Sequence, residues 1–114
     1  MKRGEIWSVS GGPDYTGKPR SVAILQDGRF EGLQSITFCP LTTNPTPAPL
    51  FRLTVKPGAH NGLKEESSLM VDKMTTVTKT KLGRRIGQLE DQDVLRLNRA
   101  VMVFLGLAGA SPGD

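Results

Sequence analysis

The stretch Arg20-Ser21-Val22-Ala23-Ile24-Leu25-Gln26 decides the fold class of this chain. It is a β-branched apolar run of strand length, and such runs are typical of a central strand in a sheet. Asp27-Gly28 then turns the chain, and a second strand is predicted from Ser35 to Leu41. The two runs therefore predict an antiparallel hairpin, with Asp27-Gly28 near its turn.

Four further strands are predicted on either side of this hairpin. Glu5–Val9 and Phe51–Val55 alternate polar and apolar side chains, which is typical of half-buried strands. A long strand is predicted from Ser68 to Val77, and a shorter one from Arg84 to Leu89. Short strands at close spacing indicate a mostly β fold, either a small antiparallel barrel or a strongly curled sheet.

The end of the chain changes to a helical pattern that begins at Asp91. Its apolar residues fall at three- and four-residue spacings, so the helix is expected to pack one stripe against the sheet. We expect one domain over residues 1–107 and a flexible tail over residues 108–114, with no repeat or second domain. The apolar positions of the helix are Val94, Leu95, Leu97, Val101, Phe104 and Leu105.

The charge balance favours a polyanionic partner. The chain has 15 Lys and Arg against 11 Asp and Glu, a net charge of +4 and a pI near 9.6. Nucleic acid is the commonest such partner, although a basic surface also suits an ordinary soluble protein. Since neither a signal peptide nor a membrane span is recognisable, the sequence predicts a cytoplasmic protein without membrane contact.

Several classes of catalytic site are excluded by residue type. The single cysteine, Cys39, allows no intramolecular disulfide and is expected to be a buried small hydrophobe. The single histidine, His60, cannot form the histidine pair of pancreatic-type ribonucleases. No glycine-rich phosphate loop opens a helix, and no acidic spacing matches a two-metal site. We therefore expect chemistry without a metal or another cofactor.

The first polar loop, residues 11–19, is rich in turn formers and chemically active side chains. It carries Asp14, Tyr15 and Lys18, and it delivers Arg20 at the start of the central strand. Tyr15 could stack on a base, or it could be an ordinary loop residue.

A second polar loop places Thr42, Thr43 and Asn44 directly after the predicted strand that ends at Leu41. In an antiparallel hairpin the start of one strand lies beside the end of the other. Arg20 and Thr42 are therefore expected to lie close together.

This pair suits phosphodiester cleavage in RNA, in which the 2′-hydroxyl of the substrate is the nucleophile. A guanidinium such as that of Arg20 matches phosphate geometry, and the hydroxyl of Thr42 can donate a further hydrogen bond. A carboxylate such as Asp14 could accept the proton. An arginine at a strand start can also be purely structural, and the residues alone leave both interpretations open.

Several blocks of the sequence resemble the MazF/PemK/Kid family of bacterial toxins, in the same order. Together with the closing helix they cover essentially everything before the tail. The blocks are Lys2–Val9, Gly17–Gln26, Phe38–Pro45, Leu69–Val77 and Leu82–Gly87.

The resemblance implies a fold, an activity and partners. The fold would be a small SH3-like antiparallel barrel with a C-terminal helix, and the protein would form homodimers. The activity would be sequence-specific, metal-independent cleavage of single-stranded RNA, chiefly mRNA, leaving a 2′,3′-cyclic phosphate and a 5′-hydroxyl. A cognate antitoxin would inhibit it by laying a flexible segment over the RNA site.

The resemblance also assigns residues. The family's catalytic arginine falls on Arg20, with Ser21 in place of the proline that follows it, and its phosphate-contacting threonine falls on Thr42. Its acidic loop residue falls on Asp14, in a loop that is one residue longer here. An aspartate of the long strand falls on Asp72.

Met70 replaces the arginine that some relatives carry two residues before that aspartate. Flanking nucleotides would be bound by basic and polar residues near the site, although Lys73 and Lys79 could equally be solvated. These candidate RNA-binding residues are Lys18, Tyr15, Thr43, Asn44, Lys73 and Lys79.

Two alternatives remain. CcdB-like toxins share the architecture but poison gyrase, and they depend on an aromatic contact near the C-terminus. This chain ends in Ala108–Asp114 without an aromatic residue. A non-catalytic RNA-binding barrel would keep the basic loops without needing Arg20 and Thr42 at one phosphate.

Overall fold

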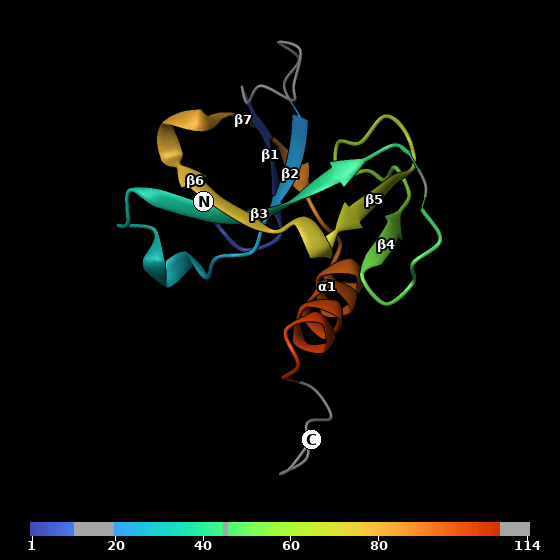
Figure 1. The fold of residues 1–114 in the computed structure, drawn as a ribbon. Helices are drawn as coiled ribbons and strands as arrows, with labels where there is room; N and C mark the ends of the chain where they lie inside the picture. The colour runs from blue at the N-terminus through green and yellow to red at the C-terminus, as the bar shows by residue number, and fades with distance from the viewer. Residues whose placement is uncertain (11–19, 45, 108–114) are drawn as a thin grey trace, which may run out of the picture.

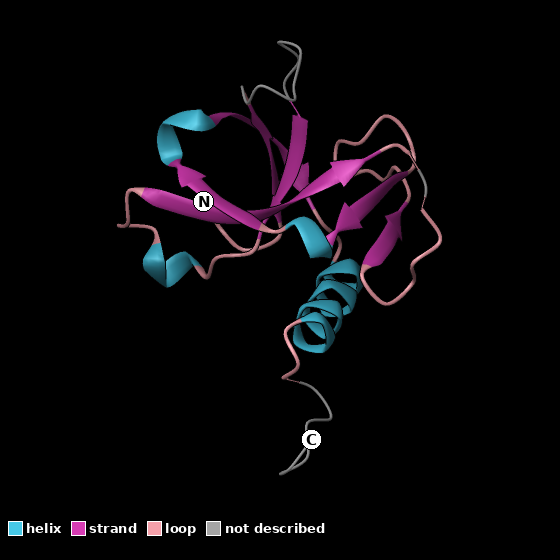
Figure 2. Cartoon of the chain, viewed as in Figure 1, coloured by secondary structure: helices cyan, strands magenta, loops and turns pink. Residues whose placement is uncertain are grey.

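The computed structural model describes residues 1–10, 20–44 and 46–107, which form a curled antiparallel sheet and a C-terminal helix (Figure 1). The strands bend across one another rather than lying in one flat layer (Figure 2). The predicted class, mostly β with one closing helix, is confirmed. The strands are β1 (Glu5–Val9), β2 (Arg20–Ile24), β3 (Ser35–Thr42), β4 (Arg52–Val55), β5 (Ser67–Met70), β6 (Thr75–Thr78) and β7 (Leu82–Gln88).

The sheet has the order β4-β5-β3-β2-β1-β7, and β6 also pairs with β3. The β2–β3 pair thus lies at the centre, and its antiparallel pairing confirms the predicted hairpin. Its connection is longer than a tight turn, because the carboxylate of Asp27 accepts a hydrogen bond from the amide of Arg29 and caps a 3-10 turn, η1 (Gly28–Phe30). β2 ends two residues earlier than predicted, and β3 continues to Thr42.

The single long strand predicted from Ser68 to Val77 is wrong. A 3-10 turn, η2 (Val71–Lys73), divides it into β5 and β6, so that Asp72 and Lys73 lie in a turn and not in a strand. Both strands pair with β3, but six positions separate Leu69 from Thr75 while three separate their partners Leu41 and Phe38. The extra residues bulge out of the ladder.

Contacts distant in sequence hold that bulge. The side chain of Val71 is fully buried, and its amide donates to the carbonyl of Phe51. The carboxylate of Asp72 binds the guanidinium of Arg52 on β4. A local pattern of β-forming residues does not indicate these interactions, because their partners are distant in sequence. For this reason the sequence predicted an unbroken strand.

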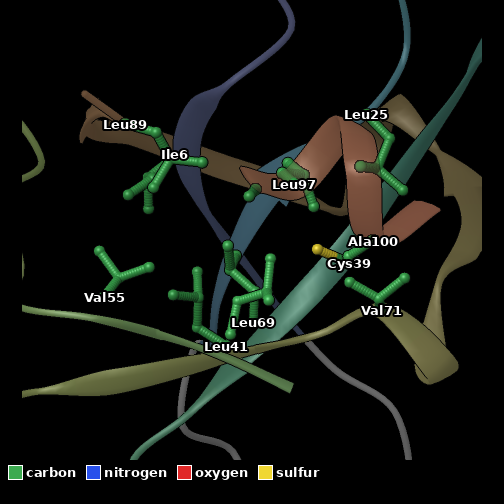
Figure 3. Packing of buried hydrophobic residues seen from close by; sticks show 12 residues of the cluster. Ile6, Leu25, Cys39, Leu41, Val55, Leu69, Val71, Leu89, Leu97 and Ala100 are labelled. Carbon is green, nitrogen blue, oxygen red and sulfur yellow. The ribbon is translucent and has the colours of Figure 1, made fainter. Parts of the chain in front are cut away.

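Buried side chains fill both faces of the central strands. Ile6, Ala23 and Cys39 face a large cluster that also contains Leu97 and Ala100 of the helix α1 (Asp91–Phe104) (Figure 3). The residues that alternate with these along the same strands face a second cluster, which includes Val22, Ile24 and Phe38. The predicted burial of Cys39 is confirmed.

The apolar stripe of α1 is only partly buried. Leu97 is fully buried and Val94 and Val101 are half-buried, but Leu95 and Leu105 are more than half exposed. The predicted stripe was therefore too wide, because the helix runs away from the sheet toward its C-terminal end (Figure 1). No helix of the described residues is long and apolar enough to span a membrane.

A buried asparagine organises the segment between β4 and β5. Asn61 is 1% exposed, and its Oδ1 accepts hydrogen bonds from the amides of Gly58 and Leu63, both at 3.0 Å. Its Nδ2 donates to the carbonyl of Lys56 at 2.8 Å. The segment then crosses β7 so closely that a Cβ on Gly87 would lie 2.4 Å from the carbonyl carbon of Asn61.

We predict that Gly87→Ala lowers the free energy of unfolding by about 3 kcal/mol, because backbone must move to admit the methyl group. The control is Gly32→Ala, whose Cβ would meet no atom within 4 Å. Urea unfolding followed by circular dichroism measures both variants. Equal midpoints for the two would contradict this account of the crossing.

Candidate functional site

Arg20 and Thr42 line the same cleft at one end of the β2–β3 pair. The alignment of β2 with β3 is set by the pairs Val22–Pro40, Ala23–Cys39 and Ile24–Phe38. Continuing each strand by two residues beyond Val22 and Pro40 leads to Arg20 and Thr42. A cleft of about 280 Å³ lies at this point. Its lining residues are Arg20, Ser21, Leu41, Thr42, Thr43 and Ser67. The predicted proximity of Arg20 to Thr42 agrees with this cleft.

A second cleft, of about 370 Å³, adjoins the first and shares four of its residues. Its volume lies within the range of about 300–1,000 Å³ that is usual for small-molecule sites. Arg20 lines both clefts and therefore stands where they meet. The residues found only in the second are Ser8, Gly62, Leu63, Lys64, Glu65, Arg84 and Ile86.

Strand alternation places hydroxyl groups along the clefts. Ile6 and Ala23 face the large core cluster, and two residues away along β1 and β2 the same face carries Ser8 and Ser21, which pair directly across the strands. The apolar face of the sheet thus becomes polar where it reaches the clefts. Neither serine was predicted from the sequence as a site residue, although alternation could have placed both.

The side chain of Thr42 is held in a local turn. Its Oγ1 accepts a hydrogen bond from the backbone amide of Asn44 at 3.1 Å. Because the oxygen acts as the acceptor in that bond, the hydroxyl hydrogen can still be donated to another group. Such a fixed hydroxyl suits an anionic oxygen bound beside Arg20.

Asp72 lines neither cleft, and its carboxylate is occupied by Arg52. Nε of Arg52 lies 2.6 Å from one carboxylate oxygen, and its second terminal nitrogen lies 2.9 Å from the other. This hydrogen bonding holds the pKa of Asp72 below its usual value. The pair fastens η2 to β4 and leaves Asp72 on a different part of the sheet from the junction of β2 with β3.

The other candidate residues are distributed unevenly. Thr43 lines both clefts, whereas Asn44 is exposed beside them. Lys73 is exposed on η2, and Nζ of Lys79 donates to the carbonyl of Glu31. The candidates Asp14, Tyr15 and Lys18 lie outside the described residues, as do the predicted tail at 108–114 and its proposed flexibility.

The described residues offer neither a metal site nor a reactive thiol. No group of three or more His, Cys, Asp and Glu side chains comes together there in a way that could hold a metal ion. Burial raises the pKa of the Cys39 thiol to about 12, so this side chain is a neutral part of the core. Arg84 and Lys64, which were not selected from the sequence, add positive charge to the second cleft.

Comparisons with known proteins show the family to which the chain belongs. The model of the PemK-like, MazF-like toxins of type II toxin–antitoxin systems matches residues 2–105. The chain belongs to this family. A probable endoribonuclease MazF from Mycolicibacterium smegmatis is 48% identical over 109 residues, which are 96% of this chain and all of the relative. The recognition of the family from sequence blocks is thereby confirmed.

Solved structures show the same fold. The Mycobacterium tuberculosis toxin MazF-mt6 superimposes with a TM-score of 0.76 at 28% identity, covering 90% of this chain and 97% of the toxin. A mycobacterial endoribonuclease in complex with its cognate antitoxin gives a TM-score of 0.78 at 21% identity, with 96% of this chain and 99% of that chain covered. This second likeness supports the fold.

We predict that Asp72→Asn lowers the free energy of unfolding near neutral pH by about 1–2 kcal/mol, since Arg52 loses its charged partner. The pKa of Asp72 is lowered in the folded chain, so its stabilisation is present above the unfolded pKa and is lost as pH falls through the folded value. The deficit of the variant should therefore shrink in acid.

Urea unfolding between pH 7 and pH 2 checks this expectation. Glu66→Gln, which removes a carboxylate that is exposed on the described surface, is the control. A deficit of Asp72→Asn that stays constant across this pH range would contradict the role of the ion pair.

Proposed function

We propose that this toxin cleaves single-stranded RNA at the meeting point of the two clefts, with Arg20 and Thr42 on the scissile phosphate. The observation that carries the proposal is the β2–β3 register, which leads to Arg20 opposite Thr42 at one cleft. Family membership and the 48% identity to a probable endoribonuclease support the same reaction.

The chemistry follows from what such a pair can do. The 2′-oxygen attacks phosphorus as its proton leaves, and the bond from phosphorus to the 5′-oxygen breaks. Arg20 stabilises the charge that develops on the phosphoryl oxygens and protonates the leaving 5′-oxygen. Thr42 donates its hydroxyl hydrogen to a phosphoryl oxygen, while Asn44 holds its oxygen. The products are a 2′,3′-cyclic phosphate and a 5′-hydroxyl.

For the proton acceptor we favour Asp14 over Asp72. Both carboxylates of the family pattern have a counterpart in this chain, but Asp72 is bound on both oxygens by Arg52 and lines neither cleft. We therefore assign to Asp72 the task of holding η2 in place. Asp14 precedes Arg20 by six positions in the sequence.

We propose that the substrate is mRNA, cut at preferred sequences, and that no metal takes part. Lys18, Tyr15, Thr43 and Asn44 would contact the flanking nucleotides. Lys73 would contact more distant phosphates, and so would Lys79 where its bond to Glu31 permits. Base stacking on Tyr15 and cationic contacts to phosphates are sequence-tolerant and salt-dependent.

The test is incubation of the purified protein with mixed-sequence RNA in EDTA, followed by mapping of the ends. We predict cleavage with cyclic-phosphate ends, and we predict that Arg20→Ala lowers kcat by about 10²–10³, the usual loss for one donor to a developing oxyanion. Thr42→Val should lower kcat about tenfold or more, because the phosphate loses one hydrogen-bond donor.

Asp72→Asn, assayed well below its melting temperature, serves as the comparison and should keep most of its activity. Intact RNA in every buffer would overturn the nuclease assignment. RNA that is bound but not cut would favour the non-catalytic barrel, and full activity of Arg20→Ala would overturn the site assignment alone.

We also propose that two copies pair through the exposed face of α1 and the residues after it. Large apolar side chains are exposed there, a feature typical of interaction surfaces. A small core also gains stability when copies associate. These side chains are Leu95, Met102, Val103, Phe104, Leu105 and Leu107.

Sedimentation equilibrium checks the pairing. We predict a dimer whose dissociation constant rises at least about tenfold in Met102→Glu, because a carboxylate would be buried against the partner. Gln92→Glu, at an exposed position near the start of the same helix, is the control. Equal dissociation constants for the two variants would contradict this choice of surface.

The cognate antitoxin would act at the clefts. Arg20, Lys64 and Arg84 give them positive charge, which suits a flexible acidic segment as well as RNA. We therefore expect the antitoxin to compete with RNA rather than to bind elsewhere.

A further inference from the structure

The second cleft owes its shape to a bulge between β1 and β7. Trp7 pairs with Arg85 and Val9 with Leu82, so Gly83 and Arg84 together face the single residue Ser8. The amide of Arg84 donates to Oγ of Ser8 at 2.9 Å. Such bulges redirect a side chain away from the regular alternation of a strand.

Glycine at position 83 is what allows this arrangement. A Cβ there would lie 2.4 Å from Oγ of Ser8, so any larger residue would displace the hydroxyl that holds the amide of Arg84. Ser8 in turn pairs directly with Ser21, the neighbour of Arg20. The position of Arg84 is thus tied through two adjacent strands to the proposed scissile phosphate.

The opposite wall of the cleft is equally well anchored. It is formed by Gly62–Glu65 and Ser67, which follow the buried Asn61, and Gly62 lies against Ile86 of β7. This wall presents Lys64 and Glu65, both exposed on the surface of the cleft.

Four charged side chains of the described residues line the second cleft. Arg20, Lys64 and Arg84 face one carboxylate, Glu65, so positive charge is in excess. Within the described part of the chain, the side chain of Arg84 has no ion-pair partner. The next residue, Arg85, lies outside this cleft and binds Glu5 at 3.2 Å.

The distance between Arg84 and Arg20 suits two successive phosphates of one RNA strand. Arg84 on β7 and Arg20 on β2 are separated by β1, and three neighbouring strands span about 10 Å between the outer two. Two long side chains and one nucleotide can bridge that span.

We propose that this second cleft binds a nucleotide that flanks the scissile phosphate, and that Arg84 and Glu65 are specificity-determining residues. The inference rests on the proposed function and deepens it. Arg84 holds the phosphate of the flanking nucleotide, and Glu65 accepts a hydrogen bond from an exocyclic amino group of its base. Adenine, cytosine and guanine offer such a group, whereas uracil does not.

The binding test uses a mixed-sequence single-stranded oligonucleotide of 2′-deoxyribonucleotides, which lacks the attacking hydroxyl. We expect Arg84→Ala to weaken its binding about tenfold, as for the loss of one charged hydrogen-bonding contact. The slope of log K against log salt should fall by about 0.7, the value for one phosphate of a single strand. The matched control is Arg85→Ala, which removes the same charge from the same strand.

The specificity test maps the ends produced from mixed-sequence RNA by the wild type and by Glu65→Gln. We expect the wild type to disfavour uracil at one position beside the cut, and Glu65→Gln to accept it there. Arg84→Lys, which keeps the charge, should recover part of the binding lost in Arg84→Ala, a recovery that a general folding defect would not show.

The outcomes separate this inference from the proposed function. If the wild type cuts RNA but Arg84→Ala binds like Arg85→Ala and Glu65→Gln leaves the map unchanged, the subsite is overturned and the nuclease stands. If the wild type cuts nothing but Arg84→Ala alone loses binding, the cleft assignment stands without the nuclease. If the wild type neither cuts RNA nor binds the oligonucleotide, the subsite and the nuclease assignment are both overturned.

Discussion

The antiparallel register between β2 and β3 is the constraint on which the rest of the structure depends, and burial enforces it. Val22 and Ile24 face one core cluster while Ala23 faces the other, and Phe38 and Cys39 are divided between the clusters in the same way. A slip of one residue would exchange the faces of every side chain on a strand. Tight packing on both sides therefore also sets the alignment that leads to Arg20 and Thr42 at one cleft.

Around this pair the strands supply hydroxyl groups and the charges of Arg20 and Arg84, and a connecting segment adds Lys64 and Glu65. Hydroxyl side chains extend from the core-facing side of β1 and β2, while Lys64 and Glu65 arrive on a segment anchored by Asn61. Under the function proposed above, this division would hold one phosphate firmly and leave the selection of nucleotides to the segments. Variation in the segments can alter the bases accepted without disturbing the register of the strands.

The ion pair of Arg52 with Asp72 shows how a family position can take on a structural task. Its hydrogen bonds stabilise η2, where Val71 is buried close to the helix. The same contacts interrupt what would otherwise be one continuous strand. Of the two acidic positions that the family resemblance suggests, Asp72 is thus bound by Arg52, which is why we propose Asp14 as the proton acceptor.

The sequence by itself determined the mostly β class, the closing helix, the central hairpin and the closeness of Arg20 to Thr42, because alternation and turn residues act over short distances along the chain. Tertiary structure alone decided the break at Val71–Lys73, the exposed part of the helix stripe and the placement of Arg84 in one cleft with Arg20. Each of these depends on partners far apart in sequence: Arg52 with Asp72, the helix with the sheet, and Ser8 with the amide of Arg84. A local sequence pattern does not indicate such a partner, because the contact forms, and stabilises the chain, only when folding brings the two residues together.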